Sequence, residues 1–259
     1  MDKKIGIILT SIERPQSLKK SVESILTVWQ DEWALFIGLQ DDYESESFSV
    51  IEKIIEDNPD KEIRLYDLEY DCGISVARNE LIQKVSLWGI PYTLLTADSI
   101  TFQDMACLYE LIEYMRLNNI DLVGLELLNR IPWEAKLNLI PNQSFELDFI
   151  DYKEKEKYVS ISCDIVRNFW IARTAALIKV PYDEQLIMCE HEDFFWRAKI
   201  HGFVCGCTNT CAGIYNKEEN TPEYDKIRTK NFRIGQQRLK DKYSLKGWVT
   251  YKHFERTQL

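Results

Sequence analysis

Short apolar runs alternate with runs of helical spacing along the first half of the chain, and this alternation restricts the fold more than any other feature. Lys4–Leu9 is apolar and β-branched, and Ser17–Val28 then repeats apolar residues every three or four positions. The same alternation continues through strand-like runs at Ala34–Leu39, Ile63–Tyr66, Tyr92–Thr96 and Asp121–Leu127, with helical runs at Phe48–Ile55, Ile74–Val85 and Met105–Asn118. Strands that alternate with helices form parallel βαβ units. We therefore expect the α/β class, with a mainly parallel central sheet and flanking helices.

The second half of the chain has a weaker pattern. Helical spacing returns at Thr174–Ile178 and at Glu190–His201, whereas Lys136–Lys157 is charged and is expected to be rich in loops. That segment fits an insertion on the substrate side or a solvated excursion equally well. Beyond residue 216 the composition changes, with ten Lys or Arg against four acidic residues between Thr221 and Leu259. We expect a catalytic-sized domain at 1–216 and a basic, partly helical C-terminal extension at 217–259.

Charge and hydropathy exclude some classes of partner. The net charge of −10 argues against a broad nucleic-acid interface. Neither an apolar run of membrane-spanning length nor a signal peptide is recognisable, so we expect a cytoplasmic protein. Its basic tail could hold it at the inner face of the membrane as a peripheral protein. Cys205, Cys207 and Cys211 lie among small and apolar residues without a histidine at a usual zinc spacing. We interpret them as buried thiols.

Polar residues follow several of the predicted strands. Thr10, the pair Asp41-Asp42, and Asp98 each stand where an apolar run ends. Open parallel sheets bind ligands at the carboxyl ends of their strands, so Asp41 or Asp42 is a candidate contact to a base or ribose. An aspartate in this position is also a common turn or helix cap. Arg78 follows Gly73 and Ser75 in the first turns of a predicted helix, which Ser75 could cap, and it could reach a diphosphate or pair with a neighbouring acid.

Several blocks of the sequence resemble family 2 glycosyltransferases of the GT-A fold, which is Rossmann-like and binds nucleotide-diphospho-sugars. They are Thr10-Ser11-Ile12-Glu13-Arg14-Pro15, Asp41-Asp42, Gly73-x-Ser75-x-Ala77-Arg78-Asn79 and Tyr92 to Ser99. Three later blocks are similar to β-1,4-N-acetylgalactosaminyltransferases: Asn168 to Thr174, Tyr182-Asp183, and His191-Glu192-Asp193-Phe194-Phe195. The resemblance extends from about Ile5 to Cys207.

The resemblance implies roles for individual residues. Thr10, Arg14, Asp41 or Asp42, Arg78 and Asp98 would belong to the donor site. Asp193 would be the catalytic base that removes the acceptor proton. Without the resemblance, we would interpret Asp193 as part of an acidic first turn that complements the helix dipole.

The chain departs from the family at the metal motif. Family members place Asp-x-Asp after the fourth strand, but this chain has Ala97-Asp98-Ser99, and the later histidine is missing from Cys211–Asn216. One carboxylate is a poor site for Mg²⁺ or Mn²⁺, so no metal ligand and no firm cofactor are predicted. Arg228, Lys230 and Arg233 in the basic tail are candidates to offset the charge of the departing diphosphate. The tail fits a solvated amphipathic helix or a weak membrane contact as well.

These features predict an inverting glycosyltransferase. The donor would be a nucleotide-sugar, with UDP-GalNAc, UDP-Gal or UDP-GlcNAc as candidates, and the acceptor a hydroxyl of a glycan or lipid-linked sugar. The alternatives are a catalytically silent sugar-binding relative and a CDP-dependent transferase on the same scaffold.

Overall fold

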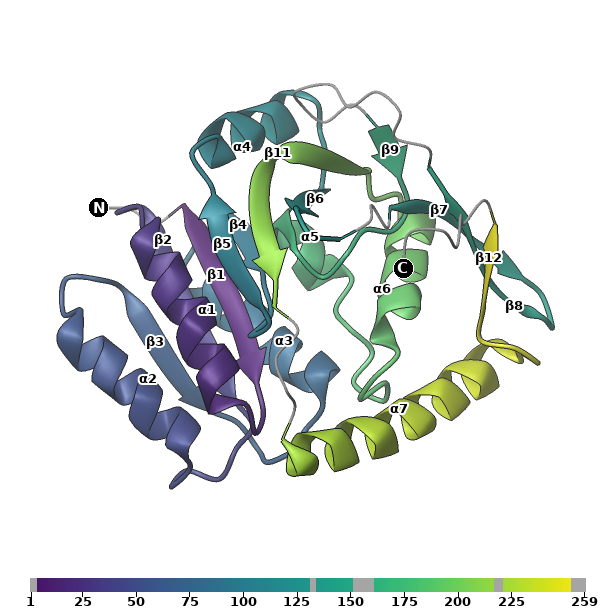
Figure 1. Ribbon diagram of the computed structural model, residues 1–259. Coiled ribbons are helices and arrows are strands. Elements are labelled where there is room, and N and C mark those ends of the chain that lie inside the picture. The colour runs from purple at the N-terminus through teal and green to yellow at the C-terminus, as the bar shows by residue number, and fades with distance from the viewer. Residues whose placement is uncertain (1–3, 131–133, 151–160, 217–220, 253–259) are drawn as a thin grey trace.

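A computed structural model describes residues 4–130, 134–150, 161–216 and 221–252 (Figure 1). Within these ranges the central sheet has nine strands in the order β3-β2-β1-β4-β10-β6-β11-β5, and β9 pairs with β11 at one side. The strands of this sheet are β1 (Ile5–Ser11), β2 (Trp33–Leu39), β3 (Ile63–Asp67), β4 (Tyr92–Leu95), β5 (Ile100–Asp104), β6 (Leu122–Leu127), β9 (Ile161–Cys163), β10 (Trp170–Arg173) and β11 (Cys205–Tyr215). The predicted α/β class with flanking helices is confirmed.

The first four strands form the parallel half of the sheet. Strand β1 pairs in parallel with both β2 and β4, and β2 pairs in parallel with β3. Every residue of β2 is buried, as expected for a strand with helices on both faces. The strands predicted from the apolar runs are all present, and their ends differ by only a residue or two from those expected.

The second half of the sheet is mixed. Strand β10 is antiparallel to both β4 and β6, whereas β6 is parallel to β11. Strand β11 also pairs antiparallel with β5, and its register shifts between Cys207 and Ala212. The buried thiols predicted for Cys205, Cys207 and Cys211 are confirmed, since all three lie buried on this strand.

Helices cover both faces of the sheet. One apolar core joins the sheet to α1 (Pro15–Thr27), α2 (Glu46–Asp57) and α4 (Leu108–Leu117). The opposite core includes residues of α3 (Ile74–Leu87), α5 (Thr174–Lys179) and α6 (Glu190–Ile200). This arrangement places the amino ends of α1 and α3 beside the carboxyl ends of the parallel strands, because each helix follows its strand directly.

The prediction of a loop at Lys136–Lys157 is wrong for most of the residues that the structure describes there. Strands β7 (Ala135–Ile140) and β8 (Ser144–Phe149) form an antiparallel hairpin, with Asn142 in a left-handed conformation at the turn. Its burial alternates along β7, which is the period of a strand with one face in the core. Strand β12 (Val249–Lys252) adds to β8 in parallel and completes a three-stranded sheet. Residues 151–157 lie outside the described residues.

Helix α7 (Pro222–Tyr243) confirms the predicted helical part of the basic extension. It begins with Thr221, whose hydroxyl accepts a hydrogen bond from the Tyr224 amide at 3.1 Å. The helix runs along the molecule from the loop after β1 to the small sheet (Figure 1). In the described ranges no helix combines the length and the apolarity needed to cross a membrane. The division into domains at residue 216 stays a prediction.

Candidate active site

A cleft of about 720 Å³ opens at the carboxyl ends of the parallel strands. Its walls come from the loops after β1, β3 and β4, from the segment that leads into α6, and from one side of α7 and β12. The residues of α7 that line it recur at helical spacing, which shows that one face of the helix is turned toward the cleft. They are Tyr224, Ile227, Arg228, Asn231 and Phe232.

The loops after β1 and β4 meet at a buried ion pair. Arg14 Nη1 lies 2.7 Å from one carboxylate oxygen of Asp98, and the Ser11 hydroxyl donates to the other oxygen at 2.8 Å. Both side chains are buried and both line the cleft beside Thr10. The Nε–H of Arg14 is also buried and has no hydrogen-bond partner among the described residues. The ion pair therefore neutralises Asp98 and leaves one guanidinium donor of Arg14 unused.

The surroundings of Asp98 offer few ligands to a divalent metal. Both oxygens of Asp98 already have partners, and its neighbours Ala97 and Ser99 offer no charge. Within the described part of the chain, no group of three or more His, Cys, Asp or Glu residues could hold a metal ion. The absence of a metal requirement stays a prediction.

Arg78 reaches the cleft from the second turn of α3, as expected. It is almost fully buried, lies 2.6 Å from a carboxylate oxygen of Glu190, and packs on the Tyr182 ring at 5.1 Å. Its Nε–H is buried without a hydrogen-bond partner among the described residues. The expected cap by Ser75 is wrong, because its hydroxyl donates to the Leu186 carbonyl instead.

The expected nucleotide contacts of Asp41 and Asp42 are not supported. Asp41 is buried and accepts hydrogen bonds from the Glu13 amide at 2.7 Å and the Ser45 hydroxyl at 3.4 Å, so it stabilises the neighbouring loops. Asp42 is exposed, and neither acid lines the cleft. Gln40, one residue earlier, does line it, and its side-chain oxygen accepts from the Gly73 amide at 3.0 Å. The strand end is as predicted, but the adjacent residue faces the cleft.

The basic tail contributes one of the three cations expected from it. Arg228 lines the cleft and donates to the Tyr224 hydroxyl at 3.0 Å, and the Tyr224 ring also stacks with Arg14 at 4.9 Å. Lys230 instead lies 3.5 Å from Asp71, and Arg233 is exposed outside the cleft. A helix turns only part of its circumference toward a partner, so neighbouring cations on α7 face different ways.

The apolar residues of α7 are used within the protein. Leu239 is buried, while Ile227 and Phe232 face the cleft. The amphipathic membrane contact considered for the tail therefore gains no support from α7, and membrane association stays a prediction.

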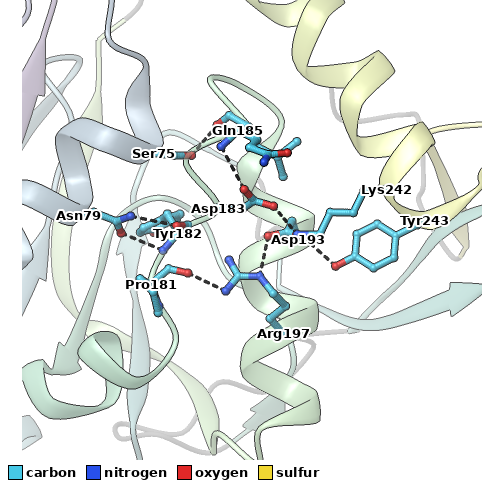
Figure 2. A network of polar contacts seen from close by, with 11 residues as sticks. Ser75, Asn79, Pro181, Tyr182, Asp183, Gln185, Asp193, Arg197, Lys242 and Tyr243 are labelled. Atoms are coloured by element: carbon cyan, nitrogen blue, oxygen red, sulfur yellow. Dashed lines mark hydrogen bonds and ion pairs between the residues drawn. The ribbon is translucent and has the colours of Figure 1, made fainter. Parts of the chain in front are cut away.

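Asp193 does not reach the cleft, which contradicts its expected role as the base. Its carboxylate is fully buried and contacts Arg197 at 2.7 Å, Lys242 at 2.6 Å and the Tyr243 hydroxyl at 2.7 Å (Figure 2). Figure 2 shows that the carboxylate lies between α6 and the end of α7. One oxygen attaches α7 to α6 through Lys242 and Tyr243, and the other pairs with Arg197 within α6, so no acceptor hydroxyl could approach them. The spacing of Asp193 and Arg197 already allowed an ion pair between successive turns of one helix.

Glu192, one residue earlier, points into the cleft. Burial raises its pKa to about 7, and the negative charge of Glu190 adds to the rise, whereas the indole N–H of Trp248 opposes it. That indole N–H is buried and lies near Glu192, but it forms no hydrogen bond among the described residues. His191 also lines the cleft, but burial and the charge of Arg78 lower its pKa to about 3. Glu192 is therefore the titratable group in the cleft that changes charge near neutral pH.

Sequence reasoning missed Glu192 and the aromatic side of the cleft. The sequence presents His191 to Phe195 as one block, but successive side chains on a helix point about 100° apart. Trp248 and Tyr251 follow α7 in sequence with no motif around them. They reach the cleft only through tertiary contacts with residues more than fifty positions earlier in the chain, and no local motif shows such contacts.

Comparison with known proteins gives matches only at the level of structure. No family model matches the sequence, and no curated protein is similar enough to count as a match. Among solved structures, TarS from S. aureus aligns with a TM-score of 0.60 at 12% identity, covering 92% of this chain and 40% of TarS. The chain also spans 66% of the TarS 1–349 structure, and in a complex of that fragment with UDP the TM-score is 0.58 at 11% identity. The mannosyltransferase PcManGT from Pyrobaculum calidifontis, in complex with GDP-Man and Mn²⁺, aligns with a TM-score of 0.64 at 9% identity over 92% of this chain and 64% of its own.

The chain has the GT-A fold. Identities near 10% carry the likeness no further than the fold. These neighbours are TarS and a mannosyltransferase, so the closer resemblance to β-1,4-N-acetylgalactosaminyltransferases gains no support. The site residues of this chain have to be argued from its own geometry.

Proposed function

We propose that this protein is an inverting glycosyltransferase that moves a sugar from a nucleoside-diphosphate donor to an acceptor hydroxyl. One observation carries the proposal. Glu192, a carboxylate with a pKa near neutrality, shares a single cleft with the guanidinium groups of Arg14, Arg78 and Arg228. A base for the acceptor and positive charge for a leaving diphosphate are the two elements that such a transfer needs. The structural neighbours, which include complexes with UDP and with GDP-Man, support the same reading.

The three arginines form the proposed diphosphate site. Arg14 and Arg78 each keep one buried Nε–H without a partner among the described residues, and a phosphate oxygen or an ordered water would satisfy such a donor. Arg14 and Arg228 both lie within 6.0 Å of the Tyr224 ring, so their charges converge from two sides of the cleft. Guanidinium groups bind phosphate oxygens through pairs of N–H donors.

Glu192 is the proposed base because the other candidates are unsuitable. Glu190 pairs with Arg78, His191 is too weak a base at a pKa of about 3, and the carboxylate of Asp193 lies outside the cleft. In the proposed step, Glu192 takes the proton of the acceptor hydroxyl as its oxygen attacks the anomeric carbon. The bond to the diphosphate oxygen breaks on the opposite side, and its electron pair stays on the diphosphate beside the arginines. A single displacement of this kind inverts the anomeric configuration.

Transfer is proposed to require no divalent metal. Arg14 already neutralises Asp98, and Arg228 adds a second guanidinium group to the cleft. Preorganised guanidinium groups can stabilise a developing negative charge without a metal. The nucleotide and the sugar remain open among UDP-GalNAc, UDP-Gal, UDP-GlcNAc and a GDP-sugar.

A thermal-shift screen tests the donor site. UDP, GDP, CDP and CMP are each added to the full chain in EDTA and in Mn²⁺, and the melting temperature is compared with that of the protein alone. We expect one nucleoside diphosphate to stabilise the chain equally in both buffers, because binding to the folded state alone raises its stability. Release of sugar from the corresponding donor then measures the reaction. Stabilisation that appears only with Mn²⁺ would contradict the metal-free site, and no stabilisation by any diphosphate would contradict the proposed function.

A further inference from the structure

The cleft has an aromatic part that the proposed donor site does not use. Phe232 of α7 and Trp248, at the start of β12, pack edge to face with their ring centroids 5.1 Å apart. Tyr251 is the third residue of β12 and also lines the cleft. All three rings come from the C-terminal extension, whereas Thr10, Arg14 and Asp98 come from the strand ends.

These rings line the cleft together with Glu192. The Trp248 indole is near enough to Glu192 to oppose the rise of its pKa, and the negative charge of Glu192 adds to burial in raising the pKa of Tyr251. The Cys189 thiol, three residues before Glu192, donates to the Phe232 carbonyl at 3.8 Å. The aromatic rings and the carboxylate therefore belong to one part of the cleft.

The rings keep accessible faces. Phe232 is 36% exposed, Tyr251 is 52% exposed, and Trp248 is half-buried, although aromatic side chains in a folded protein usually bury most of their surface. Leaving apolar ring surface in contact with water costs about 25 cal/mol for each Å². Apolar surface gathered in a cleft beside a titratable group is typical of a ligand site.

We infer that Trp248, Phe232 and Tyr251 form an acceptor platform, on which the pyranose ring of an uncharged carbohydrate stacks with one hydroxyl directed at Glu192. A pyranose presents C–H groups on its faces and hydroxyls at its edge, which matches apolar rings around a carboxylate. An open-chain polyol has no such face. The ionised carboxylate of Glu192 disfavours an anionic acceptor here. The inference rests on the proposed function, since it uses Glu192 as the base.

The extension holds the platform in place. The Phe145 amide donates to the Trp248 carbonyl at 3.0 Å, and β12 pairs with β8 from Val249 onward. Upstream, Tyr243 and Lys242 are attached to the buried Asp193. Asp193 is thus a positioning residue for Trp248, five residues beyond the end of α7, and it acts without touching the acceptor.

The test compares Trp248→Ala with the matched control Trp88→Ala, a partly exposed tryptophan at the end of α3 that does not line the cleft. Binding of methyl and octyl β-pyranosides to the full chain is measured by saturation-transfer NMR, with sorbitol and sorbitol phosphate as open-chain probes. Donor hydrolysis to water and transfer to the pyranoside are measured with the donor that the nucleotide screen selects. Tyr251→Ala on the exposed strand and Trp248→Phe repeat the comparison where Trp248→Ala fails to fold.

We expect Trp248→Ala to weaken pyranoside binding and to raise the acceptor KM by roughly tenfold, a larger effect than its effect on donor hydrolysis to water. Trp248→Phe should recover most of the loss, and Trp88→Ala should bind as wild type. Equal loss of hydrolysis and transfer, or tighter binding of an open-chain probe, would overturn the platform while the proposed function stands. Pyranoside binding that depends on Trp248 in a chain that hydrolyses no donor would support the platform and overturn the proposed function.

Discussion

Replacing Glu192 by glutamine separates the proposed base from its neighbours, because the amide keeps the shape of the side chain and removes its charge. The carboxyl has an ordinary pKa of 4.5 when exposed and a pKa of about 7 when buried in the cleft. That difference corresponds to about 3 kcal/mol between the protonated and ionised forms of the folded protein. The perturbation therefore has consequences for stability as well as for activity.

The direction in which pH changes the free energy of unfolding depends on whether the folded or the unfolded state binds the Glu192 proton more tightly. The folded protein holds the Glu192 proton up to about pH 7, whereas the unfolded chain releases it near pH 4.5. The wild-type free energy of unfolding therefore falls by about 3 kcal/mol as pH rises through this window, and Glu192→Gln lacks that fall. Urea denaturation at pH 5 and pH 8 should show the variant gaining about 3 kcal/mol on the wild type. Glu80→Gln, on the exposed side of α3, is the control.

The same substitution has a separate effect on the reaction. Wild-type transfer should rise with pH through about 7 as Glu192 ionises, and Glu192→Gln should lose about 10²- to 10⁴-fold at pH 8 and show no such rise. Nucleotide binding should be unchanged, because the base acts on the acceptor. A stability difference that does not vary with pH would refute the burial argument, and normal transfer by the variant would remove Glu192 from the mechanism.

Three further results are expected. Asp193→Asn should lower the free energy of unfolding by about 3 kcal/mol, because Arg197 and Lys242 lose a buried partner; donor hydrolysis that stops while stability is unchanged would contradict this. Arg228→Ala should weaken nucleoside-diphosphate binding by about tenfold in titration calorimetry, and the exposed Arg233→Ala should not; equal effects would exclude a directed contact. Gly235→Ala should lower the melting temperature, since an added Cβ would lie 2.1 Å from the Met188 carbonyl oxygen; an unchanged melting temperature would show that α7 is not seated there.

The sequence by itself determined the order of the elements and the edge at which the site forms. Apolar runs of strand length and runs of helical spacing are local signals, and they predicted β1 to β4 with α1 to α3 between them. The polar residues at Thr10 and Asp98 marked the strand ends that line the cleft. The segment Ala97-Asp98-Ser99 likewise predicted that no metal site forms after β4, and this stays a prediction.

Tertiary structure decided which side chain at each place faces the cleft. Gln40 lines it where Asp41 was expected, and Glu192 lines it where Asp193 was expected, because a shift of one residue turns a side chain to another side of its element. The charge on Asp98 is likewise balanced by Arg14, a partner 84 residues away. Neighbours in sequence are visible in a motif, but the orientation and pairing of their side chains are not.

The C-terminal extension shows most clearly what the sequence alone could not predict. Its positive charge was readable from composition, and it suggested a cluster of cations over the donor. In the folded chain only the side of α7 that carries Arg228 meets the cleft, and aromatic residues fill much of that side. Composition counts every residue of a segment equally, whereas packing selects one face of a helix through contacts such as Gly235 against Met188 and Tyr243 with Asp193. Those contacts join segments far apart in the chain, and for that physical reason only the tertiary structure could specify them.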